Sequence, residues 1–268
     1  MAECYASPQE GAEYDPQDPV WGRRLGMALD AGELLLQSGA EVSRVEDTIQ
    51  RLCRRCGFAR VDVFTITSSI VVTARLPGEC SFTQTRRILT RNTDLGKVEQ
   101  VNALSRRFCA GQMGPDAFAA ALEQVRGEQP APAWLPLVLY MVISWSLSVF
   151  FGGSWWDGAA AAISGMALYA MIRMSAVLQM NSLLQTAVCS AVTALTVVLL
   201  VEAGVGTHPD KIMIGNIMLL IPGIQLTTSL RDMINGDTIS GVLNLSEALL
   251  KAISVALGFS LVLLAGGV

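Results

Sequence analysis

Ionisable and helix-breaking residues gather in one stretch of an otherwise apolar C-terminal half. The dipeptide Pro222-Gly223 interrupts an apolar run, because proline lacks the N–H group that a helix needs. Transporters use such broken helices to offer backbone groups to a substrate, where protein or a water-filled cavity covers them. Polar residues follow the break, among them Gln225, Thr228, Arg231 and Asp232. The pattern predicts a substrate pathway, and an ordinary proline kink is the alternative.

A polar stripe marks the last expected helix. At about 100° per residue, one face collects its polar and small residues. They are Asp237, Ser240, Asn244, Glu247, Lys251, Ser254 and Gly258. Glu247 and Lys251 are spaced i, i+4, in the order that favours an ion pair. Ionisable groups in spanning helices normally face a bundle interior or a pathway. We predict that Asn244 and Lys251 belong to the substrate pathway and that Glu247, Asp232 and Asp237 serve ion coupling. In the alternative, Glu247 and Lys251 only neutralise each other.

Other chemistry finds little support. The single histidine, His208, lies in the apolar half, so the N-terminal half has no histidine to activate a serine or cysteine nucleophile. Cys53 and Cys56 have no second cysteine pair nearby, so we interpret the six cysteines as reduced thiols. A net charge of −4 argues against nucleic acid as a partner. We expect no catalytic site, no metal and no cofactor.

Charge divides the chain near Trp134. Of the 19 Lys and Arg residues only Arg173, Lys211, Arg231 and Lys251 follow it. A water-soluble unit of that size would need a charged surface, so this half is expected to face lipid. A spanning helix takes about 17–25 mostly apolar residues. We predict five: 135–151, 157–174, 183–203, 211–230 and 243–265.

The predicted fold class is therefore a membrane protein with an N-terminal soluble α+β domain followed by an α-helical bundle of five transmembrane helices. Residues 1–18 are acidic, lack an apolar run and are predicted to be a disordered tail. Helical and strand-like patterns predict the α+β domain over 19–128, and a Pro-rich linker occupies 129–133. The transmembrane domain is predicted over 134–268. With the soluble domain in the cytoplasm, the five spans place the C-terminus on the periplasmic or outer side.

Three stretches together resemble the bacterial threonine/serine exporter family (ThrE/YjjP-like). The first is Leu34–Glu46, and the second joins Asn92–Leu95 to Val98–Asn102. The third and most specific runs from Pro222 to Asp232, through Asn235–Gly241, to Glu247-Ala248. Within it the resemblance carries over to Pro222, Gly223, Arg231, Asp232, Gly236, Asp237 and Glu247.

The resemblance implies an inner-membrane secondary exporter of small carboxylate-bearing metabolites, threonine and serine or a dicarboxylate such as succinate. Five helices are few for an alternating-access carrier, which often uses two repeats. The chain looks like the split YjjP-type half, which works with a second small membrane subunit (YjjB-like), and a homo-oligomer is a further possibility. Two other functions stay open: a membrane-anchored ligand sensor or scaffold, and a passive metabolite channel.

Overall fold

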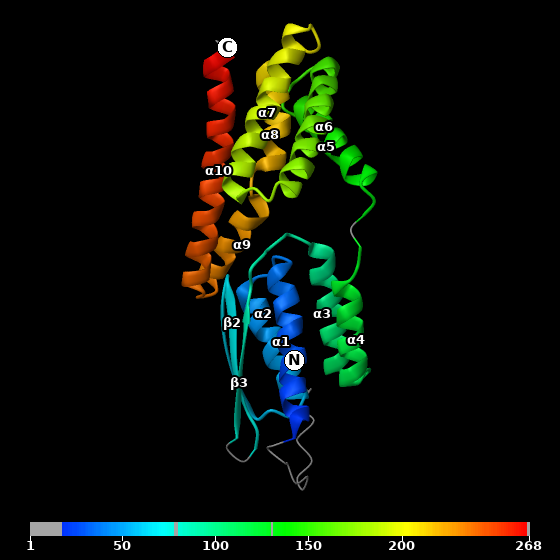
Figure 1. The fold of residues 1–268 in the computed structure, drawn as a ribbon, viewed down its shortest axis with the longest axis vertical. Coiled ribbons are helices and arrows are strands. Elements are labelled where there is room, and N and C mark those ends of the chain that lie inside the picture. Colours follow the sequence, from blue (N-terminus) through cyan, green and yellow to red (C-terminus); the bar gives the residue numbers. More distant parts are fainter. Residues whose placement is uncertain (1–17, 78–79, 130, 267–268) are drawn as a thin grey trace. The chain divides into compact units, whose positions relative to one another are not determined.

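The computed structural model describes residues 18–77, 80–129 and 131–266, which form two compact units (Figure 1). The N-terminal unit holds the described residues up to 129 and also residues 225–245. The C-terminal unit holds residues 131–224 and 246–266. A C-terminal segment thus packs with the N-terminal domain, whereas the sequence assigned it to the transmembrane domain. The predicted tail lies almost wholly outside the described residues.

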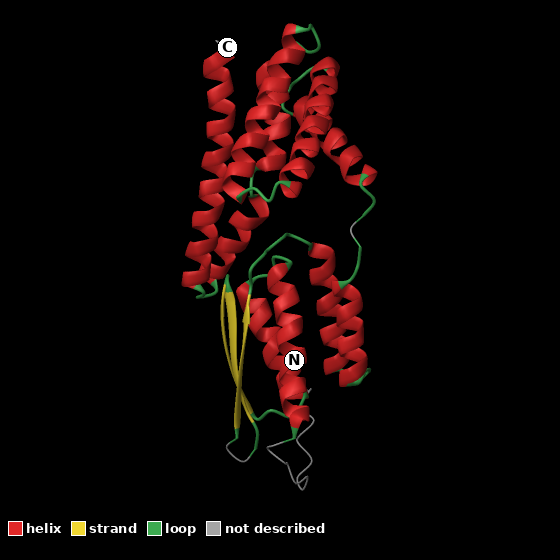
Figure 2. Ribbon diagram, in the orientation of Figure 1, coloured by secondary structure: helices red, strands yellow, loops and turns green. Residues whose placement is uncertain are grey.

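Four helices and three strands make up the N-terminal part of the first unit (Figure 2). The helices are α1 (Pro19–Gln37), α2 (Val42–Arg55), α3 (Leu95–Cys109) and α4 (Pro115–Arg126). The strands are β1 (Arg60–Ile66), β2 (Ser69–Arg75) and β3 (Ser81–Arg87). They pair as an antiparallel meander in the order β1-β2-β3, with Val63 opposite Val72. The α+β combination predicted for the N-terminal residues is therefore present.

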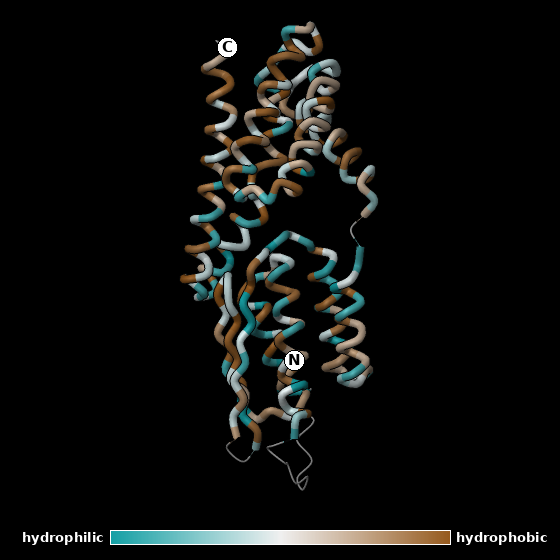
Figure 3. The backbone as a smooth tube through the Cα atoms, in the orientation of Figure 1, coloured by the Kyte–Doolittle hydropathy of each residue, from teal (hydrophilic) through white to brown (hydrophobic). Residues whose placement is uncertain are grey.

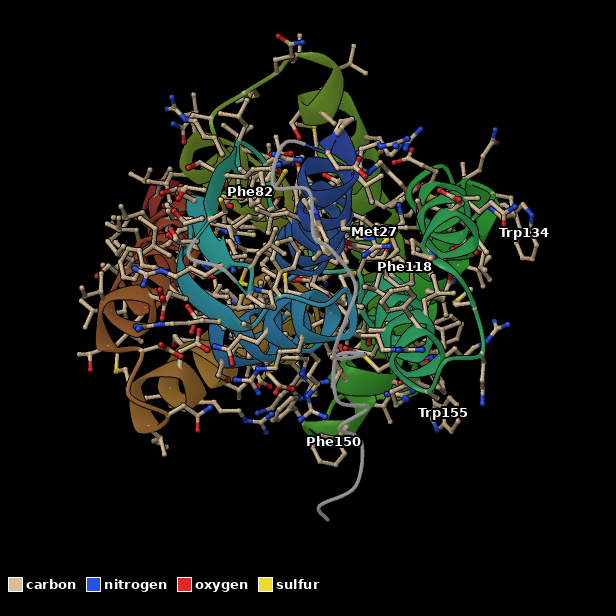
Figure 4. All side chains as sticks on the ribbon, turned by 90° about the horizontal axis from the view of Figure 1, so that it is seen from below. Met27, Phe82, Phe118, Trp134, Phe150 and Trp155 are labelled. Carbon is tan, nitrogen blue, oxygen red and sulfur yellow. The ribbon has the colours of Figure 1, made fainter. Side chains whose placement is uncertain are left out.

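The core of this unit follows from periodicity. Alternate residues of β2, namely Ile70, Val72 and Ala74, are fully buried, as period-2 patterning requires. They join the buried faces of the helices in one hydrophobic core. Met27 and Phe118 belong to this core, whereas Trp134, Phe150 and Trp155 of the other unit carry largely exposed side chains (Figure 4). Exposed aromatic residues at helix ends are typical of membrane interfaces.

The C-terminal unit is built from apolar helices. They are α5 (Trp134–Phe150), α6 (Trp155–Val177), α7 (Ser182–Glu202), α8 (Pro209–Leu220) and the later part of α10 (Thr238–Gly266). α9 (Gly223–Ile234) precedes α10. A small core joins Ala161 and Ile212 to Val255 and Phe259 of α10. Hydrophobic residues predominate along α5, α7 and α10 in Figure 3, and many large ones are exposed, as expected of lipid-facing surfaces.

Span length gives a lower number than predicted. Among the described residues, α6, α7 and α10 are each long and apolar enough to cross a membrane. A fourth span results if the bent pair α8 and α9 counts as one. α5 is apolar but has only 17 residues. The apolar helices are those of a membrane protein, and the five-span bundle stays a prediction.

The structure divides one predicted span and moves the start of another. The expected span 211–230 is divided into α8 and α9 at the predicted Pro222-Gly223 interruption, because Pro222 has no N–H to continue the ladder. The last helix begins at Thr238 and not at 243. Apolar content marked its predicted start, but a helix can begin in its polar segment when other protein elements pack there.

Candidate functional site

The interruption between α8 and α9 is short and sharp. Ile221 has extended backbone angles, φ −66° and ψ 126°, and accepts a hydrogen bond from the Gly223 N–H at 2.8 Å. α9 starts at once at Gly223, and the two helix axes differ by 49°. The break predicted at Pro222-Gly223 is confirmed.

Residues 225–245, here called the α9–α10 hairpin, form a tight turn. Gly236 adopts a positive φ of 97° there, and the Asp237 N–H donates to the Asp232 carbonyl at 2.9 Å. The two helices approach closely at Gly241, where a Cβ atom would lie 2.9 Å from the Ser229 carbonyl oxygen. The hairpin therefore depends on a glycine at that crossing.

The hairpin carries a buried polar cluster. Asp232 is 1% exposed, and its Oδ1 accepts a hydrogen bond at 3.1 Å from the backbone N–H of Val42, the first residue of α2. The amide of Asn244 donates to Asp232 Oδ2 at 3.5 Å. Arg91 in turn donates to Asn244 Oδ1 at 2.6 Å. A carboxylate at the N-terminus of a helix is stabilised by the unsatisfied N–H groups and by the helix dipole.

Three further contacts join the hairpin to the N-terminal domain. Arg231 forms an ion pair with Glu41, the residue before α2. Asn235 donates to Ser43 Oγ at 3.2 Å. Ser240 donates to the Thr65 carbonyl at 3.4 Å.

Acidic groups near this junction, Asp237 and Glu46 among them, are held toward their neutral form. Burial raises the pKa of the Asp237 carboxyl. Burial also raises the pKa of Glu46, and the negative charge of Asp237 adds to the effect. The backbone N–H of Thr65 donates to Glu46 at 2.8 Å, and this hydrogen bond lowers the pKa of Glu46 and so partly offsets the effect of burial. A raised pKa suits a proton carrier, but a buried structural carboxyl shows the same shift.

The other predicted site residues are close in sequence to these. Gln225 donates to the Asn244 carbonyl at 3.4 Å, and the Thr228 hydroxyl donates to the Gln225 carbonyl at 3.1 Å. The structure thus brings Gln225 and Asp232 to Asn244, while the pathway role of all three stays a prediction. It places Arg231 against Glu41, a partner that the sequence did not indicate.

The predicted ion pair of α10 is formed. Lys251 Nζ lies 2.8 Å from Glu247 Oε1, with the Lys251 side chain 24% exposed and that of Glu247 50% exposed. The fully buried face of α10 here is apolar and includes Ala248, Val255 and Phe259. Glu247 and Lys251 therefore lie beside the packed face and not at its centre.

A buried polar cluster in the C-terminal unit was missed. Asn216 of α8 is 0% exposed. Its Oδ1 accepts from the Ser144 hydroxyl of α5 at 3.0 Å, and its Nδ2 donates to Ser164 Oγ of α6 at 2.8 Å. Close packing at Gly215, where a Cβ would lie 2.7 Å from the Ser144 carbonyl oxygen, brings α5 and α8 together. A single asparagine in an apolar run has no periodicity that would have revealed it.

The cysteine pair at the end of α2 is expected to be unreactive. Cys53 and Cys56 are free and buried, and burial raises the pKa of the Cys56 thiol to about 11. Thiols with such pKa values stay protonated and react slowly. Within the described part of the chain, no three His, Cys, Asp or Glu side chains are grouped to bind a metal ion.

A cavity of about 310 Å³ opens in the N-terminal domain. Arg24 and Arg55 line it together with Cys56, Phe108, Met113 and the first residues of α4. Arg24 also donates to the Cys56 carbonyl at 3.0 Å. Two guanidinium groups beside apolar side chains are compatible with a small anionic ligand.

Comparison with known proteins decides the family. The model of the ThrE threonine/serine exporters matches residues 26–265. The chain belongs to the threonine/serine exporter family. This is a family of membrane transporters and not of enzymes, which accords with the apolar helices of the chain.

Relatives of this chain differ in length. A "Probable threonine/serine exporter" of Mycobacterium tuberculosis is 22% identical over 87% of this chain, which spans 44% of that relative. A "Threonine/serine exporter" of Corynebacterium glutamicum is 22% identical over 88% of the chain, which spans 50% of it. The "Probable succinate transporter subunit YjjP" of Escherichia coli is 24% identical over 87% of the chain, which spans 90% of that relative. No solved structure matches. The chain thus spans about half of two relatives and most of the third.

Proposed function

We propose that this exporter-family chain is one subunit of a secondary exporter for small carboxylate-bearing metabolites in the bacterial inner membrane. The observation that carries the proposal is an ion pair, Glu247 with Lys251, within a helix that is otherwise apolar enough to span a membrane. Charged groups at membrane depth cost several kcal/mol on some scales and are normally tied to a pathway.

The pathway is assigned to the α8–α9 break and to this ion pair. Pro222 and Gly223 free α8 from continuing as a regular helix, which is how transporters present backbone groups to substrates. Lys251 would attract a substrate carboxylate and release Glu247. Glu247, then without its cationic partner, would take up the coupling proton. Gln225, Thr228 and Asn244 remain predicted members of the pathway, and Asp237 remains a predicted ion-coupling group. Arg231 and Asp232 contact the start of α2 instead and are not assigned to the pathway.

The proposed substrates are threonine and succinate, because relatives named for each match the chain at similar identity. The test is efflux from cells preloaded with either compound, in a strain that lacks its own exporters of both. We expect the wild-type chain to export one of them and Lys251→Met to lose most of the rate. Export of neither compound by a chain present in the membrane together with a YjjB-like subunit would overturn the proposal.

A second membrane subunit is part of the proposal. The chain covers 90% of a relative named as a transporter subunit but about half of two relatives named as exporters. The missing half would be supplied by another chain or by a second copy. Efflux measured with and without a co-expressed YjjB-like subunit tests this. Full export by purified monomers in vesicles would contradict it.

The assay also separates a carrier from a channel. A secondary exporter moves substrate uphill only while an ion gradient drives it. We expect uphill efflux to stop when the proton gradient is collapsed and Glu247→Gln to lack proton dependence. Downhill movement alone, unchanged by the gradient, would identify a passive channel.

A sensor function is the second candidate, and the cavity beside Arg24 and Arg55 favours it. Under this reading the N-terminal domain binds a metabolite while the helices hold it at the membrane. Binding of succinate or threonine to the full chain in detergent, abolished by Arg55→Ala, together with no efflux, would select the sensor.

A further inference from the structure

The N-terminus of α2 is closed by a residue from far along the chain. Glu41 is the N-cap residue, but its side chain makes no capping hydrogen bond. The first N–H groups of a helix need acceptors, and a buried N–H without one is costly. Asp232 supplies the acceptor for Val42 from the α9–α10 hairpin, 190 residues away. This contact therefore replaces a local cap.

Neighbouring contacts repeat the same pairing of elements. Glu41, which precedes Val42, forms an ion pair with Arg231 of the hairpin. Ser43, which follows Val42, accepts a hydrogen bond from Asn235. Thus three consecutive residues, 41 to 43, each contact the last part of α9 or the residue directly after it. A single chance contact would not produce that alignment.

The charges of this junction are matched locally. Arg231 is paired with Glu41, and Asp232 lies at the positive end of the α2 dipole. Asn244 links the same carboxylate to Arg91, because its amide donates to Asp232 while its oxygen accepts from Arg91. Arg231 thus already has a carboxylate partner within the N-terminal unit, which favours a structural role for this pair.

We propose that Arg231, Asp232 and Asn235 are positioning residues. They fix the α9–α10 hairpin to the start of α2, so that the N-terminal domain holds the second half of the broken helix throughout the transport cycle. We call the three contacts Glu41–Arg231, Val42–Asp232 and Ser43–Asn235 the joint. The effect of the joint on transport rests on the proposed exporter function, whereas the existence of the joint does not. The three residues act through the position of α9 and make no contact with substrate.

The joint can be tested without transport. Ser43→Cys and Asn235→Cys are combined in the full chain, and a protease site is placed in the linker at 129–133. After oxidation and cleavage, the two fragments should run as one band on a non-reducing denaturing gel and as two after reduction. Each single cysteine variant is the control for the native thiols. Two bands from the oxidised double variant would overturn the proposal.

Transport then tests whether the joint must stay closed. We expect the oxidised Ser43→Cys/Asn235→Cys protein to retain the export rate of the same protein when reduced. Loss of export on oxidation, regained on reduction, would show that the joint opens in each cycle and would overturn a fixed position.

Charge exchange separates positioning from folding. Arg231→Glu and Glu41→Lys should each lower the maximal export rate with little change in KM, because substrate contacts are untouched. Combining them should recover about tenfold, as expected for coupled residues in direct contact. Arg44→Gln is the matched control, since Arg44 lies 4.0 Å from the same Glu41 but does not touch the hairpin. A raised KM in Arg231→Glu without recovery in the double variant would instead place Arg231 at the substrate.

The two proposals fail in different ways. If the wild-type chain exports neither threonine nor succinate, the exporter assignment falls while the cross-link still decides whether the joint exists. If export is found but no cross-link forms, the joint falls and the exporter assignment stands.

Discussion

Asp232 accepts a hydrogen bond from the backbone N–H of Val42 at 3.1 Å, across 190 residues of sequence. Both groups are buried. The contact supplies the acceptor that α2 lacks at its N-terminus, where the N-cap side chain makes no capping hydrogen bond. It also connects the α9–α10 hairpin to the N-terminal domain. The hairpin is therefore part of the folded N-terminal unit.

Removal of the Asp232 carboxylate is expected to destabilise the protein. Asp232→Ala leaves a buried N–H without an acceptor, which costs about 1–3 kcal/mol. Asp232→Asn keeps an acceptor oxygen and should lose less. Asp47→Ala is the matched control, because Asp47 pairs with Arg51 at the surface and such pairs contribute about 0–1 kcal/mol. Unfolding of the full chain in detergent, followed by tryptophan fluorescence, measures all three; equal losses in Asp232→Ala and Asp47→Ala would contradict the cap.

The α9–α10 crossing depends on Gly241. An added Cβ would lie 2.9 Å from the Ser229 carbonyl and 3.0 Å from the Met233 nitrogen, which are backbone atoms and cannot turn aside. Gly241→Ala should therefore lower the free energy of unfolding by about 1–3 kcal/mol. Gly223→Ala is the control, since an added Cβ there meets no atom within 4 Å. The same unfolding assay applies, and a stable Gly241→Ala protein would show that the helices separate at little cost.

Local signals in the sequence predicted most elements of the N-terminal domain. Gly114-Pro115 marks the start of α4, Pro115–Arg126, and the apolar spacing of this helix is regular, so its helical pattern can be recognised from the sequence. The strand-like pattern of the α+β domain corresponds to β1, β2 and β3, which are rich in β-branched residues and bounded by turn residues. The ion pair of Glu247 with Lys251 followed from its spacing of four residues.

Contacts between distant segments could not be predicted. Arg91 and Asn244 are 153 residues apart, and nothing in either neighbourhood indicates the other. The same holds for Glu41 and Arg231. The predicted pathway residues were chosen for polarity at membrane depth, and that criterion does not separate a residue that meets substrate from one that meets another domain.

Glu46 should make stability depend on pH. Burial raises its pKa in the folded protein above the value in the unfolded chain, so the folded state holds the proton more tightly. Its stabilising contribution is full below the unfolded pKa and is lost as the pH rises through the folded pKa. The wild-type protein should thus lose stability relative to Glu46→Gln between about pH 4.5 and the raised pKa.

The glutamine variant is a close match, because its side-chain oxygen can still accept from the Thr65 N–H. Thermal unfolding midpoints of both proteins at several pH values from 4 to 8 give the difference directly. We expect Glu46→Gln to be the more stable protein at pH 7 and the gap to close in acid. A gap that is constant with pH would mean that Glu46 has the same pKa folded and unfolded.

Asn216 should hold three membrane helices together. Its amide oxygen accepts from Ser144 and its amide nitrogen donates to Ser164, so α5, α6 and α8 meet at one side chain. Asn216→Ala removes both bonds and leaves a small cavity. Hydrogen bonds between membrane helices contribute about 0.6 kcal/mol each on average, and the cavity adds to the loss, so we expect about 1–3 kcal/mol.

Met218→Ala is the matched control for this prediction. Met218 lies on the same helix but is 44% exposed, so its truncation should change stability by about 0.5 kcal/mol or less. Titration with a denaturing detergent from the folded state in mild detergent gives the two unfolding midpoints. Because α8 ends at the break before α9, a loosened α8 should also slow export while leaving the Ser43–Asn235 cross-link intact. Equal midpoints for the two variants would show that the Asn216 bonds are replaced by others in the variant, and the helices would then be held by packing alone.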